Sequence, residues 1–189
     1  GAIVVQSEPP ERWIATAIPV LGTPRHFIIS VAYCDVNLAN ALPLQVTCLY
    51  LDDTLLDPDS AAAISQMDLM HLTLSQVSVP RSLWAQISKL KKLELLSVDE
   101  VELDDEGLLQ ISQISSLHTL GVRKCGVTRN GLAALRTLPS LRKLHIDGLS
   151  DREGSLGFLK DIVGLEVLWL KSCGLNDTDM IVLAQLTQL

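Results

Sequence analysis

An eleven-residue pattern recurs along the chain and limits the folds open to it. Positions one, four, six and eleven of the pattern are apolar, and position nine is small or polar. Six segments fit it well, and they begin at Val46, Leu69, Leu93, Leu117, Leu141 and Leu165. A weaker copy begins at His26, and Leu189 is the first residue of another. A nearly constant interval, 24 residues toward the C-terminus, predicts a stack of similar units that bury one continuous core.

Each unit is expected to contain one strand and one helix. Positions four and six are apolar with a polar residue between them, which is typical of a short strand with one buried face. Three further apolar residues fall eight, five and two residues before the next start, a near-helical spacing. These sets are Leu38, Ala41, Leu44; Ala61, Ile64, Met67; Trp84, Ile87, Leu90; Leu108, Ile111, Ile114; Leu132, Leu135, Leu138; Leu156, Leu159, Ile162; and Met180, Leu183, Leu186. Helix starts are predicted at Asp57-Pro58, Asp104-Asp105, Thr128 and Asp177.

Residues 26 to 189 resemble the leucine-rich repeat family in the form that pairs one strand with one helix. The turns CGVTRNGL from Cys125 and CGLNDTDM from Cys173 look like those of bacterial repeats. The resemblance implies an α/β fold, a right-handed solenoid with a parallel concave sheet and convex helices, of about seven repeats and the start of an eighth. The unit from Leu141 departs from the pattern, with Leu149 at position nine and Asp151 at position eleven, so we expect a distorted turn there.

Residues 1 to 25 do not carry the repeat and are predicted to form an N-terminal helical cap. Ala2 to Val5 are compatible with a short strand, and Pro9-Pro10-Glu11 is typical of a helix start. One apolar helix face would consist of Trp13, Ile14, Ala17, Ile18 and Leu21. Such a helix would cover the end of a stack of repeats. No similar cap is recognisable near Leu189, so either the chain continues or that end packs against a second copy.

Charge and hydropathy exclude some partners. The net charge is −7 and the sequence pI is about 5.0, which argues against nucleic acid or an anionic membrane surface as the main partner. No apolar run approaches the length of a membrane span, and the first residues lack the features of a signal peptide. Because similar bacterial proteins often carry a membrane-spanning segment before such a start, a membrane anchor N-terminal to these residues stays open.

The four cysteines are expected to be free thiols. Cys34, Cys125 and Cys173 all occupy position nine, whose side chain points inward. Cys125 and Cys173 are two repeats apart and therefore roughly 10 Å from each other, beyond the ~7 Å limit for a disulfide. Cys48, at position three, is expected on the exposed face of the sheet. Free cysteines favour a reducing compartment such as the cytoplasm.

The sequence offers no recognisable catalytic or metal site. His71, His118 and His145 occupy positions three, two and five, so they share no column across neighbouring repeats. No metal-ligand spacing, phosphate-binding loop or nucleophile motif is present. We therefore expect neither an enzyme nor a bound cofactor or metal.

The exposed face of the strands is the candidate binding surface. Its central column is predicted to contain Ser30, Tyr50, Thr73, Ser97, Gly121, His145 and Trp169. Early units carry Asp52-Asp53 and Asp99-Glu100 beside it, and later units carry Arg123-Lys124, Arg142-Lys143 and Lys171. The charges either keep the protein in solution or form an acidic-to-basic face that orients a partner. The candidate partner-binding residues are Tyr50, His71, Arg123, Lys124, Arg142, Lys143, His145 and Trp169.

These observations favour a non-catalytic module that binds another protein, as yet unidentified, on a curved strand surface. One alternative is a self-assembling or structural element joined through an open C-terminal end, with Met180, Leu183 and Leu186 exposed, which would make a homo-oligomer. Another is the recognition part of a larger enzyme, whose catalytic domain would lie outside these residues. This function is inferred from the fold and not from a recognised site, so it is an analogy.

Overall fold

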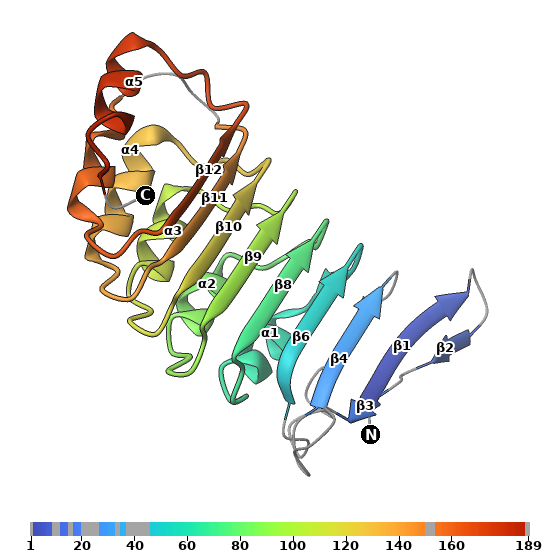
Figure 1. The fold of residues 1–189 in the computed structure, drawn as a ribbon. Helices are drawn as coiled ribbons and strands as arrows, with labels where there is room; N and C mark the ends of the chain where they lie inside the picture. Colours follow the sequence, from blue (N-terminus) through green and yellow to red (C-terminus); the bar gives the residue numbers. More distant parts are fainter. Residues whose placement is uncertain are drawn as a thin grey trace.

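The computed structural model describes residues 2–8, 12–14, 17–19, 27–32 and 35–36 as backbone strands, and residues 46–149 and 154–187 with their side chains. Most of the strands lie in one sheet (Figure 1). The repeat strands are β4 (Phe27–Ala32), β6 (Val46–Asp52), β8 (His71–Ser75), β9 (Leu95–Asp99), β10 (Thr119–Arg123), β11 (Lys143–Asp147) and β12 (Val167–Lys171). Each of these strands pairs in parallel with the next one along the chain. The predicted α/β repeat organisation is therefore present, because parallel neighbours need a crossover between them.

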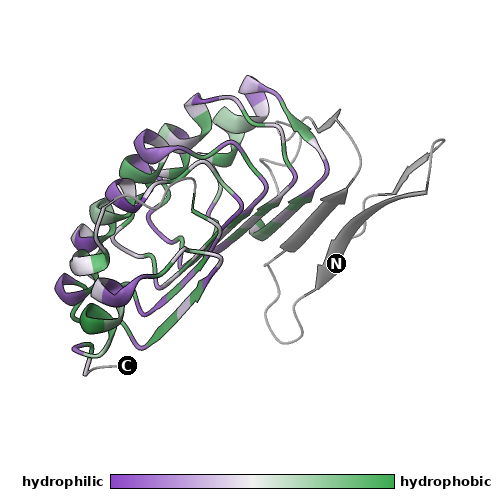
Figure 2. Ribbon diagram, turned by 90° about the horizontal axis from the view of Figure 1, so that it is seen from above, coloured by the Kyte–Doolittle hydropathy of each residue, from purple (hydrophilic) through white to green (hydrophobic). Residues whose placement is uncertain are grey.

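Short helices follow the strands from β7 onward and pack on one face of the sheet (Figures 1 and 2). They are α1 (Pro58–Ile64), α2 (Ser82–Ile87), α3 (Asp105–Ile111), α4 (Arg129–Leu132) continued by η2 (Ala133–Thr137), η3 (Leu156–Asp161) and α5 (Asp177–Leu183). A two-stranded sheet pairs β5 (Asp35–Val36) with β7 (Leu55–Leu56). Asp57, Asp104 and Thr128 cap their helices as predicted, each accepting a hydrogen bond from a backbone N–H. The cap of α5 is Asn176, one residue before the predicted Asp177.

The core lies between the sheet and the helices and is almost entirely aliphatic. Positions four and six, such as Leu96 and Val98, are buried in the units that begin at Val46 to Leu141, whereas Leu168 and Leu170 of the last unit are half-buried. The predicted helix faces from Ala61 to Ile162 are buried. The last set differs, since Met180 is 56% exposed, Leu183 is half-buried and Leu186 is buried. The exposed end face predicted from these three residues is therefore smaller than expected.

Each strand ends in the same backbone turn. The residue at position eight has a positive φ in all six units, and these residues are Asp53, Gln76, Glu100, Lys124, Gly148 and Ser172. The chain then turns inward, and the thiols of Cys125 and Cys173 each donate to a backbone carbonyl 3.1 Å away. Both are buried free thiols, as predicted, and burial raises the pKa of each. Cys34 lies outside the described residues.

The N-terminal segment corrects one prediction. In place of the expected helical cap, the structure has β1 (Ala2–Glu8), β2 (Arg12–Ile14) and β3 (Ala17–Pro19). β1 lies parallel to β4, with Val4 opposite Ser30, and antiparallel to β2. The short strand predicted from Ala2 to Val5 is confirmed. The helix predicted to include Trp13 and Ile18 is wrong, because β2 pairs with β1, and β3 with β1 and β4, and such pairing overrides the helical spacing. Leu21 lies outside the described residues, and a capping role for residues 1–25 stays a prediction.

The irregular unit from Leu141 is described only in part. Leu149 is half-buried and packs against the core. Asp151 lies outside the described residues, so the predicted distortion of that turn stays a prediction.

Candidate protein-interaction face

The face of the sheet opposite the helices is lined by the side chains at positions three, five and seven of each strand. We call this surface the open sheet face. Strand pairing places the position-five residues directly opposite one another, from Ser30 and Tyr50 through to His145 and Trp169. The predicted column is confirmed in every pair, because a 24-residue repeat keeps the same position in register along the sheet.

The two large aromatic residues of this column lie far apart. Tyr50 on β6 is 37% exposed and Trp169 on β12 is 62% exposed. Five strand spacings separate them, which is about 24 Å. Trp169 is not isolated, since its ring lies 5.6 Å from that of His145 with the planes inclined by 54°. This tilted geometry is favourable for aromatic pairs.

A hollow of about 170 Å³ opens beside this aromatic pair. Its lining comes from β10, β11 and β12 and consists of Arg123, His145, Ile146, Asp147, Trp169 and Lys171. Two of the predicted residues, His145 and Trp169, are thus brought together with the predicted Arg123. Tyr50 and His71 lie at the other end of the face.

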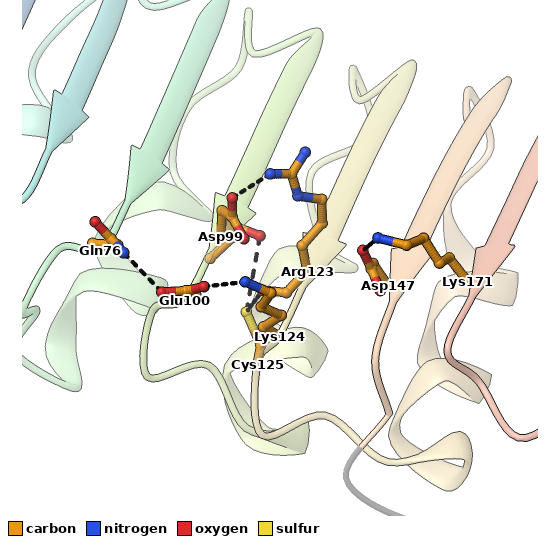
Figure 3. A network of polar contacts seen from close by, with 9 residues as sticks. Gln76, Asp99, Glu100, Arg123, Lys124, Cys125, Asp147 and Lys171 are labelled. Atoms are coloured by element: carbon orange, nitrogen blue, oxygen red, sulfur yellow. Dashed lines mark hydrogen bonds and ion pairs between the residues drawn. The ribbon is translucent and has the colours of Figure 1, made fainter.

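Charged side chains form a ladder across the ends of the strands (Figure 3). Arg123 pairs with Asp99, Lys124 pairs with Glu100, and Lys171 donates to Asp147 at 2.8 Å. Gln76 extends the ladder by donating to Glu100 at 2.8 Å. Each link joins residues 24 positions apart in sequence, and therefore adjacent repeats.

These pairs change the expected acidic-to-basic division of the face. The predicted acidic residues Asp99 and Glu100 neutralise the predicted basic residues Arg123 and Lys124. Hydrogen bonds from Gln76 and Lys124 lower the pKa of Glu100, and a hydrogen bond from Lys171 lowers the pKa of Asp147. These charges therefore form ion pairs between adjacent repeats, and the face is not divided into one acidic half and one basic half.

The remaining predicted residues lie at the start of β11, at the opposite end of the strand from this ladder. Arg142 is 3.6 Å from Glu166 and donates to the carbonyl of Gly164. Lys143 is exposed and makes no ion pair within residues 46–149 and 154–187.

At the opposite end of the face, His71 lies 3.5 Å from the thiol of Cys48. Burial raises the pKa of Cys48, so this thiol is not activated as a nucleophile. Among the described residues, no three His, Cys, Asp or Glu side chains are grouped so that they could hold a metal ion. No helix in the described part of the chain is long and apolar enough to cross a membrane.

A buried ion pair that sequence analysis missed connects two repeats that are not neighbours. Arg129 at the start of α4 is fully buried, and it donates to both carboxylate oxygens of Asp179 at 3.0 and 2.8 Å. Its other terminal nitrogen donates to the carbonyls of Cys173 and Gly174 at 2.8 and 2.7 Å. The unit from Leu141, whose sequence departs from the repeat, lies between these two repeats in the chain. The one sequence signal is that Arg129 occupies a first-turn position where α1, α3 and α5 have Pro58, Asp105 and Asp177.

No family model matches the chain, and no curated protein matches it. A solved structure of an internalin, InlF from Listeria monocytogenes strain 4b F2365, matches with 14% sequence identity and a TM-score of 0.38. The match covers 80% of this chain and 68% of the internalin chain.

Proposed function

We propose that this chain is a right-handed leucine-rich repeat solenoid that binds another protein on its concave open sheet face, without catalysis. In this proposal residues 26–189 form the repeats, which resemble bacterial ones, and residues 1–25 cover their N-terminal end. The observation that carries it is the exposed pair His145 and Trp169 beside the hollow on the open sheet face. Exposed tryptophan is enriched among the residues that dominate protein interfaces.

The scaffold suits such a role because it is already ordered. The strands are bonded to their neighbours, and leucines such as Leu72, Leu96 and Leu120 are fully buried beneath the face. A partner would therefore bind without a large cost of ordering the main chain on this side. The exposed side chains of the face can then determine which partner binds.

Changing Tyr50→Ala together with Trp169→Ala is expected to weaken partner binding strongly and to leave folding intact. Both side chains lie on the solvent side of the sheet, so the core is unchanged. Wild type and variant would be used as bait in lysate and in an envelope fraction, and a retained protein would be identified, purified and titrated. Loss of an interface tryptophan typically weakens binding by about 2 kcal/mol or more, about 30-fold in Kd.

A matched control changes two exposed apolar residues away from the face, Leu109→Ala on α3 and Val163→Ala after η3. Both are more than half exposed. Equal binding by wild type and by the Tyr50 and Trp169 double variant would refute the open sheet face as the binding surface.

Self-assembly is a second candidate, and a cluster of exposed apolar side chains at α5 favours it. Leu175 is 40% exposed, Met180 56% and Ile181 61%. A second copy that covers this end would remove the apolar area from water. Light scattering over a range of protein concentrations distinguishes the candidates, since a monomer at high concentration would rule this one out. The third candidate, recognition within a larger enzyme, requires a catalytic domain elsewhere in the protein.

A further inference from the structure

We propose that the C-terminal part of the open sheet face recognises an acidic segment of a partner protein, in which an Asp or Glu lies next to an apolar residue. The site consists of Arg123, Lys143, His145, Trp169 and Lys171, which we call the C-terminal patch. This inference rests on the proposed function and adds to it the chemistry of the partner.

The patch is assembled by strand register. His145 and Trp169 are opposite each other on β11 and β12, and Arg123, Asp147 and Lys171 form the row two residues further along the same face. Lys143 lies two residues before His145 on the same strand and therefore on the same face. The hollow between the two rows, about 170 Å³, is smaller than the roughly 300–1,000 Å³ typical of small-molecule sites. Its size suits a single side chain of a bound segment.

The ion pairs of the patch present their positive members to solvent. The side chains of Arg123 and Lys171 are 54% and 66% exposed, whereas those of Asp99 and Asp147 are 20% and 18% exposed. An anion that approaches the face therefore meets the guanidinium and ammonium groups before the carboxylates behind them. Lys143 adds a further exposed positive charge with no ion-pair partner among the described residues.

Unpaired acidic side chains lie at the other end of the face. Asp52, at position seven of β6, and Asp53 beside it make no ion pair within the described part of the chain. A basic segment would be attracted to that end and an acidic one to the C-terminal patch. The patch does not suit nucleic acid, because a polyanion would be repelled by a chain whose net charge is −7.

The aromatic pair supplies the apolar part of the recognition. Trp169 is more than half exposed, so its ring offers a large surface on which an apolar side chain can pack. A carboxylate in the hollow would lie within reach of Arg123 and Lys171, which line it together with Trp169. Charge and apolar surface side by side therefore predict an acidic residue adjacent to an aliphatic or aromatic one.

Selection from a displayed library of random peptides, each about twelve residues long, tests this inference. Peptides would be selected for binding to the folded wild-type protein. Retention of the selected peptides by the variants Trp169→Ala and Lys143→Glu would then be measured. The expected result is enrichment of Asp or Glu next to an apolar residue. A synthesised consensus peptide should bind at least about 10-fold more weakly to each variant, and more weakly to wild type at high salt.

The matched control is Lys160→Glu, which makes the same charge change at an exposed position on η3, on the helical side. It should leave binding unchanged. Peptides that depend on Trp169 but carry Arg, Lys or no charge would overturn the acidic specificity and leave the proposed function standing. No enrichment at all, or peptides insensitive to both Tyr50→Ala and Trp169→Ala, would overturn both.

Discussion

Replacing Arg129 with Met is expected to lower the free energy of unfolding by about 3–5 kcal/mol. The change leaves the carboxylate of Asp179, which is 2% exposed, inside the protein without its positive partner. It also removes the two hydrogen bonds to the carbonyls of Cys173 and Gly174. Urea unfolding followed by far-ultraviolet circular dichroism measures the loss.

The double variant Arg129→Met with Asp179→Asn is the control for the buried charge. The amide oxygen introduced by Asp179→Asn would still accept the hydrogen bond from the Asn176 backbone N–H that the carboxylate accepts in the capping box. Because no charge is then buried without a partner, the double variant should recover part of the lost stability. A loss below about 1 kcal/mol for Arg129→Met alone, the range of an exposed pair, would contradict the structural assignment.

The same ion pair determines part of the response to acid. Burial acts to raise the pKa of Asp179, but the hydrogen bond from the Asn176 backbone and the Arg129 guanidinium outweigh it, and the pKa is lowered. As pH falls, the carboxylate of Asp179 is therefore protonated in the unfolded chain before it is protonated in the folded one. The stabilisation is complete above the ordinary pKa of Asp, near about 4, and is lost as pH falls through the lowered value. The double variant should lose less stability than wild type over that acid range.

Replacing Gly131 with Ala is expected to destabilise the protein by about 2–4 kcal/mol, the scale of losing hydrogen bonds to a charged group. An added Cβ would lie 1.9 Å from Oδ1 of Asp105 and 2.8 Å from its Cβ. Asp105 would have to move, yet it accepts from the backbone N–H of Thr128 at 2.8 Å and from its hydroxyl at 2.6 Å. Those two bonds join α3 to the start of α4.

A double-mutant cycle with Asp105→Gly isolates this clash, because it removes both the carboxylate and the Cβ of residue 105. The added methyl group then has room, and Ala is favoured over Gly inside a helix by about 1 kcal/mol. Gly131→Ala should then be neutral or stabilising in the Asp105→Gly background. Equal costs in the two backgrounds, measured by urea unfolding, would show that the close approach does not determine the effect.

Features that depend on residues close together in the chain could be predicted from the sequence alone. The strand positions and the column from Tyr50 to Trp169 follow from apolar alternation and from the 24-residue period. The helix caps at Asp57, Asp104 and Thr128 follow because a cap bonds to a backbone N–H only three residues away. These features repeat in register, so each unit supports the interpretation of the next.

Features whose interacting partners are distant in sequence became visible in the three-dimensional structure. Arg12–Ile14 and Ala17–Pro19 are strands because β1 and β4 supply their backbone partners, and no local pattern reveals that pairing. The charges of the open sheet face largely neutralise one another because adjacent repeats place Arg123 beside Asp99. Arg129 lies in the core because Asp179, 50 residues further on, meets it there. The free energy of burying a charge depends on its surroundings in space, which a pattern of neighbouring residues does not contain.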